Sequence, residues 1–119
     1  MDELKKVKHI GYNSNNGCVN YEEDSLQFNE GDKQVAFIHL RGAMPNYIQS
    51  HLKIRTPNGE VILLTGKVIT NNKNVCREFA VVVDQPGVYN CQLILSYKEQ
   101  VNISNIFTYK VNSSIEGGI

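Results

Sequence analysis

The chain has 119 residues, 41% of them hydrophobic and 20% charged, and its 12 basic side chains balance its 12 acidic ones. This length predicts one domain, and this composition is typical of a folded globular chain and not of a disordered one. Because neutralised phosphates provide most of the affinity of proteins for nucleic acid, a neutral chain without a basic stripe argues against a nucleic-acid partner.

The sequence also argues against a membrane partner and against secretion. No stretch of about 18 apolar residues is present, so no membrane span is expected. The charged start, Met1–Lys6, lacks the apolar segment of a secretory signal. A native Met1 then implies a protein that is made in a cytoplasm and stays there. The odd number of cysteines favours small buried side chains over a disulfide framework at Cys18, Cys76 and Cys91.

Apolar runs predict β-strands from the amino end onward. Short strands are expected over Val7–Tyr12 and Ser25–Asn29, with the polar loop Asn13–Gly17 between them. Over Lys33–Arg41, apolar residues occupy both faces of the expected strand, which is typical of a central strand. One helical turn is expected over Pro45–Ser50.

The middle of the chain predicts a hairpin. Apolar and polar residues alternate over Gln49–Thr56, with Leu52 and Ile54 expected to point inward. Proline presets φ and Asn-Gly tolerates positive φ, so Thr56–Glu60 is expected to turn the chain into a partner strand over Val61–Leu64.

Three further strands are expected toward the carboxyl end. After the polar loop Thr70–Asn74, the first covers Val75–Asp84, and the second covers Tyr89–Tyr97 with apolar residues at alternate positions. In the last strand, Val101–Val111, every second residue is apolar except Asn105, where a bulge or bend is expected.

The clearest structural signal is the turn that leads into the second of these strands, Gly87-Val88-Tyr89. In many immunoglobulin-like sandwiches, a tyrosine at such a position bonds through its hydroxyl to upstream backbone and fixes a corner. The alternative is an ordinary buried tyrosine after a turn. We predict a structural corner at Gly87 and Tyr89 and an all-β fold, an immunoglobulin-like antiparallel β-sandwich of about seven to eight strands. Because the chain has no Trp, an antibody-type domain is not expected. The sandwich domain is expected over residues 1–112, and a linker or tail over 113–119.

No combination of residues predicts catalysis or metal binding. Nucleophile patterns such as Gly-x-Ser-x-Gly and glycine-rich phosphate loops do not occur in the sequence. His39 and His51 lie on neighbouring predicted strands but lack the further ligands that a metal site needs. The acidic run Glu22–Asp24 lacks the spacing of a calcium loop and is interpreted as a solvated turn. We therefore expect no enzyme, no cofactor and no metal.

Three tyrosines in predicted loops or edges are the candidate interaction residues: Tyr12, Tyr21 and Tyr47. Tyrosine has an apolar ring and a polar tip, which suits a patch that binds a protein or a sugar. The alternative is that they are scattered surface aromatics, which are normal in globular proteins.

Four segments follow one another in a characteristic order. They are a polar turn and strand, Phe28–Val35; a strand, Pro-Asn-Gly turn and returning strand, Leu52–Val61; a Pro-Gly-x-Tyr strand entry, Gln85–Leu93; and a closing strand, Ser104–Val111. In this order they resemble the amino-terminal domain of phage baseplate upper proteins, a family of tailed phages and prophages of Gram-positive bacteria. The resemblance covers most of the chain.

The resemblance implies a non-enzymatic structural module of a phage tail or baseplate, which anchors host-recognition components to the tail through protein–protein contacts. The implied partners are other phage tail or baseplate proteins, and a homo-oligomer of the full-length protein is left open. The implied location is the virion tail, after assembly in the bacterial cytoplasm. The alternative is a carbohydrate-binding or adhesion-type β-sandwich with Tyr12, Tyr21 and Tyr47 as its platform.

Overall fold

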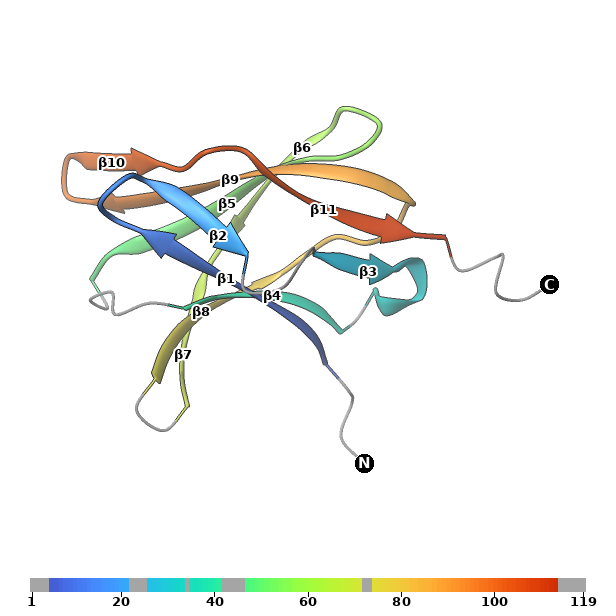
Figure 1. Cartoon of the computed structure of the whole chain (residues 1–119), viewed down its shortest axis with the longest axis horizontal. Helices are drawn as coiled ribbons and strands as arrows, with labels where there is room; N and C mark the ends of the chain where they lie inside the picture. Colours follow the sequence, from blue (N-terminus) through green and yellow to red (C-terminus); the bar gives the residue numbers. More distant parts are fainter. Residues whose placement is uncertain (1–4, 22–25, 34, 42–46, 72–73, 114–119) are drawn as a thin grey trace.

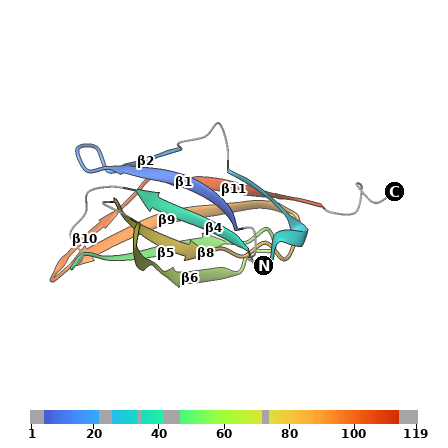
Figure 2. The same cartoon turned by 90° about the horizontal axis from the view of Figure 1, so that it is seen from below.

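The computed structural model describes residues 5–21, 26–33, 35–41, 47–71 and 74–113. These residues form eleven strands and one turn of 3-10 helix: β1 (Lys6–Asn13), β2 (Cys18–Tyr21), β3 (Gln27–Asn29), η1 (Glu30–Asp32), β4 (Ala36–Arg41), β5 (Gln49–Arg55), β6 (Val61–Thr65), β7 (Lys67–Asn71), β8 (Asn74–Ala80), β9 (Gly87–Tyr97), β10 (Gln100–Ile103) and β11 (Phe107–Asn112). Sheet A has the strand order β2-β1-β4-β8-β7, and sheet B has the order β3-β11-β9-β5-β6, with β10 also paired with β9 (Figure 1). Seen after a 90° turn, β1 and β4 lie in one layer and β5 and β6 in the other (Figure 2).

This arrangement confirms the predicted all-β sandwich. Its sheets are mixed, however, so the expectation of a wholly antiparallel sandwich is wrong: β1 pairs in parallel with β4, and β3 pairs in parallel with β11. Alternation along a strand specifies which face is buried but not the direction of the neighbouring strand. The described residues form eleven strands instead of seven to eight because β2 and β7 are too short to show long alternation, and because the last predicted strand is divided into β10 and β11. No helix among the described residues has the length and hydropathy needed to cross a bilayer.

Several element bounds differ from the sequence-based expectation. The helical turn expected over 45–50 is wrong where the structure describes it, because β5 already begins at Gln49. Strand β4 begins at Ala36, later than expected, because η1 turns the chain just before it. Strand β8 ends at Ala80, although Val81 and Val83 beyond it remain buried. The acidic run 22–24, loop residues 72–73 and tail residues 114–119 lie outside the described residues.

The break expected at Asn105 divides the last predicted strand into β10 and β11. Ser104 Oγ accepts a hydrogen bond from the Leu93 N–H of β9 at 2.9 Å, and Asn105 Oδ1 accepts one from the Val19 N–H of β2 at 2.7 Å. The irregular segment therefore bonds to both sheets. The alternation of inward and outward side chains shifts at this segment. Val101 and Ile103 therefore face solvent, while the alternate residues of β11 face the core.

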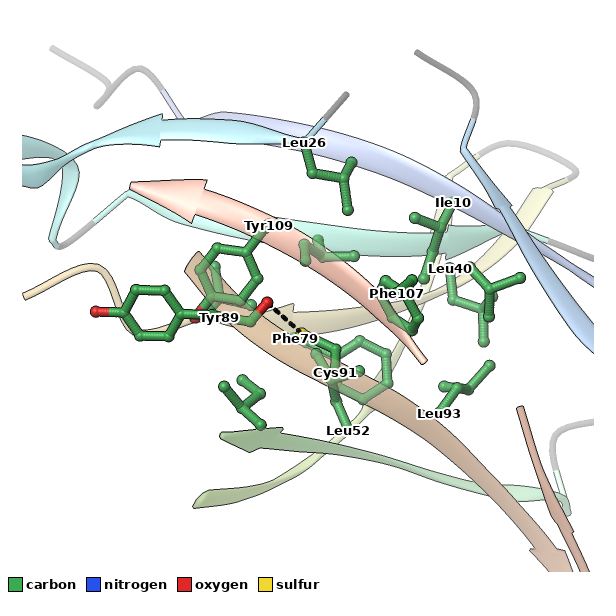
Figure 3. Packing of buried hydrophobic residues seen from close by; sticks show 14 of the residues in the cluster. Ile10, Leu26, Leu40, Leu52, Phe79, Tyr89, Cys91, Leu93, Phe107 and Tyr109 are labelled. Atoms are coloured by element: carbon green, nitrogen blue, oxygen red, sulfur yellow. Dashed lines mark hydrogen bonds between the residues drawn. The ribbon is translucent and has the colours of Figure 1, made fainter. Parts of the chain in front are cut away.

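Alternate residues of the long strands fill the space between the sheets. Leu52 and Ile54 of β5 are fully buried, as predicted, and so are Tyr89 and Leu93 of β9. Figure 3 shows Leu52, Tyr89, Cys91 and Leu93 among the packed aliphatic and aromatic groups. Period-two alternation in β5 and β9 thus specifies the inner face of sheet B.

Two stacked tyrosines hold the segment that crosses from sheet A to sheet B. The Tyr89 hydroxyl donates a hydrogen bond to the Gln85 carbonyl at 2.9 Å and accepts one from the Gln85 N–H at 3.2 Å. Its ring stacks on that of Tyr109, with centroids 4.6 Å apart, and the Tyr109 hydroxyl donates to the Val82 carbonyl at 2.6 Å. Both hydroxyls therefore bind backbone of the crossing segment.

Gly87 begins β9 in a conformation that side chains rarely adopt. Its φ is +133°, and a Cβ at this position would lie 2.8 Å from Cγ of Pro57 in the β5–β6 turn. Glycine is needed here because the backbone passes close to that turn with a positive φ.

Replacement of Tyr89 by Phe removes the hydroxyl but keeps the stacked ring. We expect Tyr89→Phe to lower the free energy of unfolding by about 1–2 kcal/mol, because two hydrogen bonds are lost and the Gln85 backbone groups lose their partner. Denaturant unfolding measures this loss. The control is Tyr47→Phe at an exposed position, expected to change stability by less than about 0.5 kcal/mol. An unchanged midpoint for Tyr89→Phe would contradict the role of the hydroxyl.

Candidate interaction surface

The outer face of sheet B exposes a group of aliphatic side chains. Val61 and Leu63 project from edge strand β6, Val101 and Ile103 from β10, and Ile106 from the segment before β11; each is more than half exposed. We call these five residues the apolar face. Single exposed aliphatic residues are normal on a protein, but a group of them on one side of one sheet is typical of a contact surface.

The cross-strand register places cations beside the apolar face. Leu63 lies opposite Lys53 and Val61 lies opposite Arg55, and Lys53 is in turn opposite Gln92 of β9. The side chains of Lys53 and Arg55 are exposed. The strands of sheet B contain no Asp or Glu, so the sheet supplies no carboxylate to neutralise these cations. The apolar face therefore lies beside two cations of the same sheet.

An open pocket of about 170 Å³ lies within this surface. Its lining combines the cations Lys53 and Arg55 with the aliphatic Val61 and Ile106 and with part of β9. Pockets for metabolite-sized ligands have volumes of roughly 300–1,000 Å³. The smaller volume and the mixed lining suit a single side chain of a protein partner, apolar along its length and acidic at its end.

The outer face of sheet A differs in that it has a carboxylate, Glu78, which pairs with neighbouring basic groups. Glu78 Oε2 lies 2.9 Å from His39 Nε2 and 3.3 Å from Lys5 Nζ. The Lys5 ammonium also lies 4.8 Å from the centroid of the Phe37 ring, and the His9 ring meets that of His39 edge-on at 5.6 Å. Sequence reasoning missed this cluster because its members come from β4, β8 and the start of the chain.

The histidines and cysteines do not form a reactive centre. His39 belongs to sheet A and His51 to sheet B, so the expectation that they lie on neighbouring strands is wrong. No group of three His, Cys, Asp or Glu within the described ranges could hold a metal ion. Cys91 is buried, as predicted, and burial raises the pKa of its thiol, which keeps it protonated and unreactive. Cys18 and Cys76 are only half-buried free thiols.

The structure divides the three candidate tyrosines between the two sheets. Tyr12 lies on β1 and packs against the core, and Tyr21 lies on β2, where its hydroxyl accepts a hydrogen bond from the Thr108 N–H at 3.0 Å. Tyr47 precedes β5 of sheet B, and its ring contacts that of Tyr97, with centroids 4.4 Å apart. Of the three, Tyr47 is the most exposed. Sequence reasoning missed the pairing of Tyr47 with Tyr97. Tyr97 continues the alternation of inward-facing residues on β9, but it lies beyond the end of the core and is exposed.

No family model and no curated protein sequence matches the chain. Among solved structures, it is similar to the N-terminal domain of phage TP901-1 ORF48, with a TM-score of 0.51. The similarity covers 91% of this chain and 98% of that domain, at 10% sequence identity. At this identity, the similarity is one of fold: the two-sheet arrangement is shared with a domain of a phage protein.

The carboxyl group of Glu78 titrates at lower pH than an ordinary glutamate. Burial raises the pKa of Glu78, but the hydrogen bonds and positive charges of His39 and Lys5 outweigh burial, and the net pKa lies below its ordinary value of 4.5. A carboxyl whose pKa is lower in the folded than in the unfolded state stabilises the fold above its unfolded pKa. This stabilisation is lost as the pH falls through the folded-state pKa.

We therefore expect Glu78→Gln to destabilise the protein by about 1 kcal/mol at pH 7. The difference from the wild type is expected to shrink as the pH falls below 4.5. Urea unfolding of both proteins at several pH values measures it. Glu99→Gln, at an exposed turn position, is the matched control. A difference that stays constant down to acid pH would show that the charge of Glu78 is not what stabilises the sheet.

Proposed function

We propose that the chain is a non-enzymatic structural module of a phage tail or baseplate, and that it docks onto a neighbouring tail protein through the outer face of sheet B. The observation that carries the proposal is the apolar face beside Lys53 and Arg55, on a sheet without carboxylates. The fold similarity to the N-terminal domain of phage TP901-1 ORF48 and the order of the sequence motifs support the phage context.

The energetics of the apolar face favour a protein partner. Full burial of one Val, Leu or Ile side chain contributes about 1.5–3 kcal/mol, and the face offers five such side chains that are more than half exposed. Their combined burial is of the size needed to offset the free energy that association costs, about 4–15 kcal/mol. The apolar face can thus contribute a large part of the free energy of docking when its residues are covered together.

The charge of this surface indicates the character of the partner. Lys53 and Arg55 on β5 and Lys110 on β11 all belong to sheet B, which has no acidic residue in its strands. A partner surface with apolar side chains and carboxylates would bury the aliphatic groups and neutralise the cations. Complementary charge of this kind mainly increases the association rate and excludes wrong partners.

In this role, the domain over residues 1–112 contacts the tail, and the tail segment 113–119 leads toward host-recognition components. The protein functions in the virion tail after assembly in the bacterial cytoplasm. Such a role requires no catalysis. The protonated Cys91 thiol and the paired Glu78 carboxylate then contribute to the stability of the fold.

The test is a charge reversal on the docking surface in the phage genome that encodes the chain. We expect Lys53→Glu with Arg55→Glu to abolish incorporation of the protein into purified particles, measured by mass spectrometry of the virions. The matched control is Lys6→Glu with Lys33→Glu, which makes the same charge change at exposed positions outside the strands of sheet B. Circular dichroism of both purified variants checks the fold. Normal incorporation of the first variant, or absence of the wild-type protein from particles, would contradict the proposal.

A second candidate function is carbohydrate binding, which the Tyr47–Tyr97 ring pair favours. The two rings lie 4.4 Å apart with an angle of 49° between their planes, and both are exposed. Exposed aromatic rings of this kind can bind the apolar side of a sugar, but they also serve as anchor residues of protein interfaces. The small pocket on sheet B lies elsewhere and does not extend this pair.

Glycan-array screening separates the two functions. Under the docking proposal, we expect no selective glycan binding by the purified chain. Selective binding that is lost on Tyr47→Ala, while Tyr21→Ala retains it, would establish the carbohydrate function instead. Tyr21 is a suitable control because its hydroxyl bonds to the Thr108 backbone and its ring contacts Phe107.

A further inference from the structure

Strand β6 is an open edge of sheet B. Among the described residues it pairs with β5 alone, and no strand covers its other side. Its inward-facing residues Ile62 and Leu64 are only half-buried, whereas Ile54 and Leu52 opposite them on β5 are fully buried. The free side of β6 is therefore exposed to solvent.

This edge lacks the features that normally prevent pairing with another strand. Its sequence, Val-Ile-Leu-Leu-Thr, has no charged residue and no proline. Natural edge strands are usually protected by lysine, proline, a bulge or very short length. Edge strand β7 carries Lys67, and edge strand β3 has only three residues. An unprotected β6 indicates an edge that is covered in the functional protein.

The hydrogen-bonding groups on the free edge can be assigned from the β5–β6 register. The Thr56 N–H bonds to the Glu60 carbonyl, and the Gly66 N–H bonds to the Ser50 carbonyl, one at each end of the hairpin. Backbone groups in an antiparallel pair point alternately toward and away from the partner strand. Even-numbered residues of β6 therefore bond to β5. The N–H and C=O groups on the free side belong to the odd-numbered residues, Val61, Leu63 and Thr65.

We propose that β6 pairs with β6 of a second copy of this chain, antiparallel about a two-fold axis at Leu63. In this register Leu63 lies opposite Leu63 of the second copy, and Val61 lies opposite Thr65. The outward N–H and C=O groups of all three residues then meet their counterparts. One register thus satisfies the whole free edge, and the two sheets B become one continuous sheet.

Charge favours a second copy as the occupant. The strand itself has no charge, so self-pairing brings no like charges directly opposite one another. The residues that flank the strand, Glu60 and Gly66, bring no cation to either end of the paired edge. The two copies of β5 lie three strand spacings apart, about 14 Å, so the repulsion between their Lys53 and Arg55 side chains is largely screened at physiological salt.

This dimer goes beyond the proposed docking function and does not depend on it, because the edge of β6 and the outer face of the sheet are different surfaces. In the dimer, the two apolar faces lie side by side on the continuous sheet. A docking partner with two equivalent sites would then bind both copies at once.

Sedimentation of the purified chain over a micromolar concentration series tests the dimer. We expect a concentration-dependent doubling of mass. Leu63→Lys places two ammonium groups opposite one another at the two-fold axis and is expected to raise the dissociation constant at least about tenfold. Ile103→Lys is the matched control: the same change on the same outer face, at 57% exposure against 60% for Leu63, but on β10. This control is expected to leave the dimer unchanged.

A cysteine at the axis provides a second measurement. Residues opposite one another in a hydrogen-bonded antiparallel pair have Cα atoms about 5.5 Å apart, a separation within the range that natural disulfides span. With oxidised glutathione as the oxidant, Leu63→Cys is therefore expected to form a covalent dimer on a non-reducing gel, and Ile103→Cys is not.

The outcomes separate the dimer from its alternatives. A chain that stays monomeric at every concentration overturns the proposal and leaves the β6 edge to a strand of a different protein. Equal weakening by Leu63→Lys and Ile103→Lys also overturns it, because the copies would then associate through the apolar face. Loss of virion incorporation with Lys53→Glu and Arg55→Glu, in a protein that still dimerises, would show that docking and dimerisation are separate.

Discussion

The stacked pair of Tyr89 and Tyr109 is the constraint on which the relation between the two sheets depends. A buried phenol must bind a partner through its hydroxyl, because an unsatisfied polar group in the core costs about 1–3 kcal/mol. Both hydroxyls find that partner in the backbone that crosses from β8 to β9. Burial raises the pKa of each phenol, so both remain protonated donors at physiological pH. The crossing chain, the entry of β9 at Gly87 and the inner face of sheet B are thereby fixed relative to one another.

The two outer faces of this sandwich differ because of how charge is distributed between the sheets. The strands of sheet A contain one carboxylate, Glu78, which pairs with His39 and Lys5. Sheet B has cations on β5 and β11, aliphatic residues on β6 and β10, and no acid in any strand. The overall charge of zero conceals this asymmetry.

Local patterns in the sequence were sufficient to predict the strands in which apolar and polar residues alternate over many positions. Leu52, Ile54 and Leu93 could be assigned to the core because period-two alternation and burial on one face are directly linked. The turn at Pro57-Asn58-Gly59 could be predicted because its backbone geometry depends on those residues alone. Strand direction could not, since the parallel pairing of β1 with β4 depends on contacts between distant segments.

The candidate surface could not be predicted for the same reason. Val101 and Ile103 share a parity with the buried residues of β11, and only the bonds of Ser104 and Asn105 to other strands reverse their orientation. The Tyr12, Tyr21 and Tyr47 patch was inferred from exposure in predicted loops. Tyr21, however, is drawn into a bond with the Thr108 backbone, 87 residues away. The absence of carboxylates from sheet B becomes visible only when the strand order is known.

The bonds of Ser104 and Asn105 have one more consequence, for the divergence of such modules. They fix the chain between β10 and β11 to the Leu93 and Val19 backbones. As a result, Val101 and Ile103 on β10 contribute little to the buried interior. Residues in β10 can therefore be exchanged over generations with small effect on folding. This end of the sandwich is a region where related domains can acquire different binding preferences while they keep one common fold.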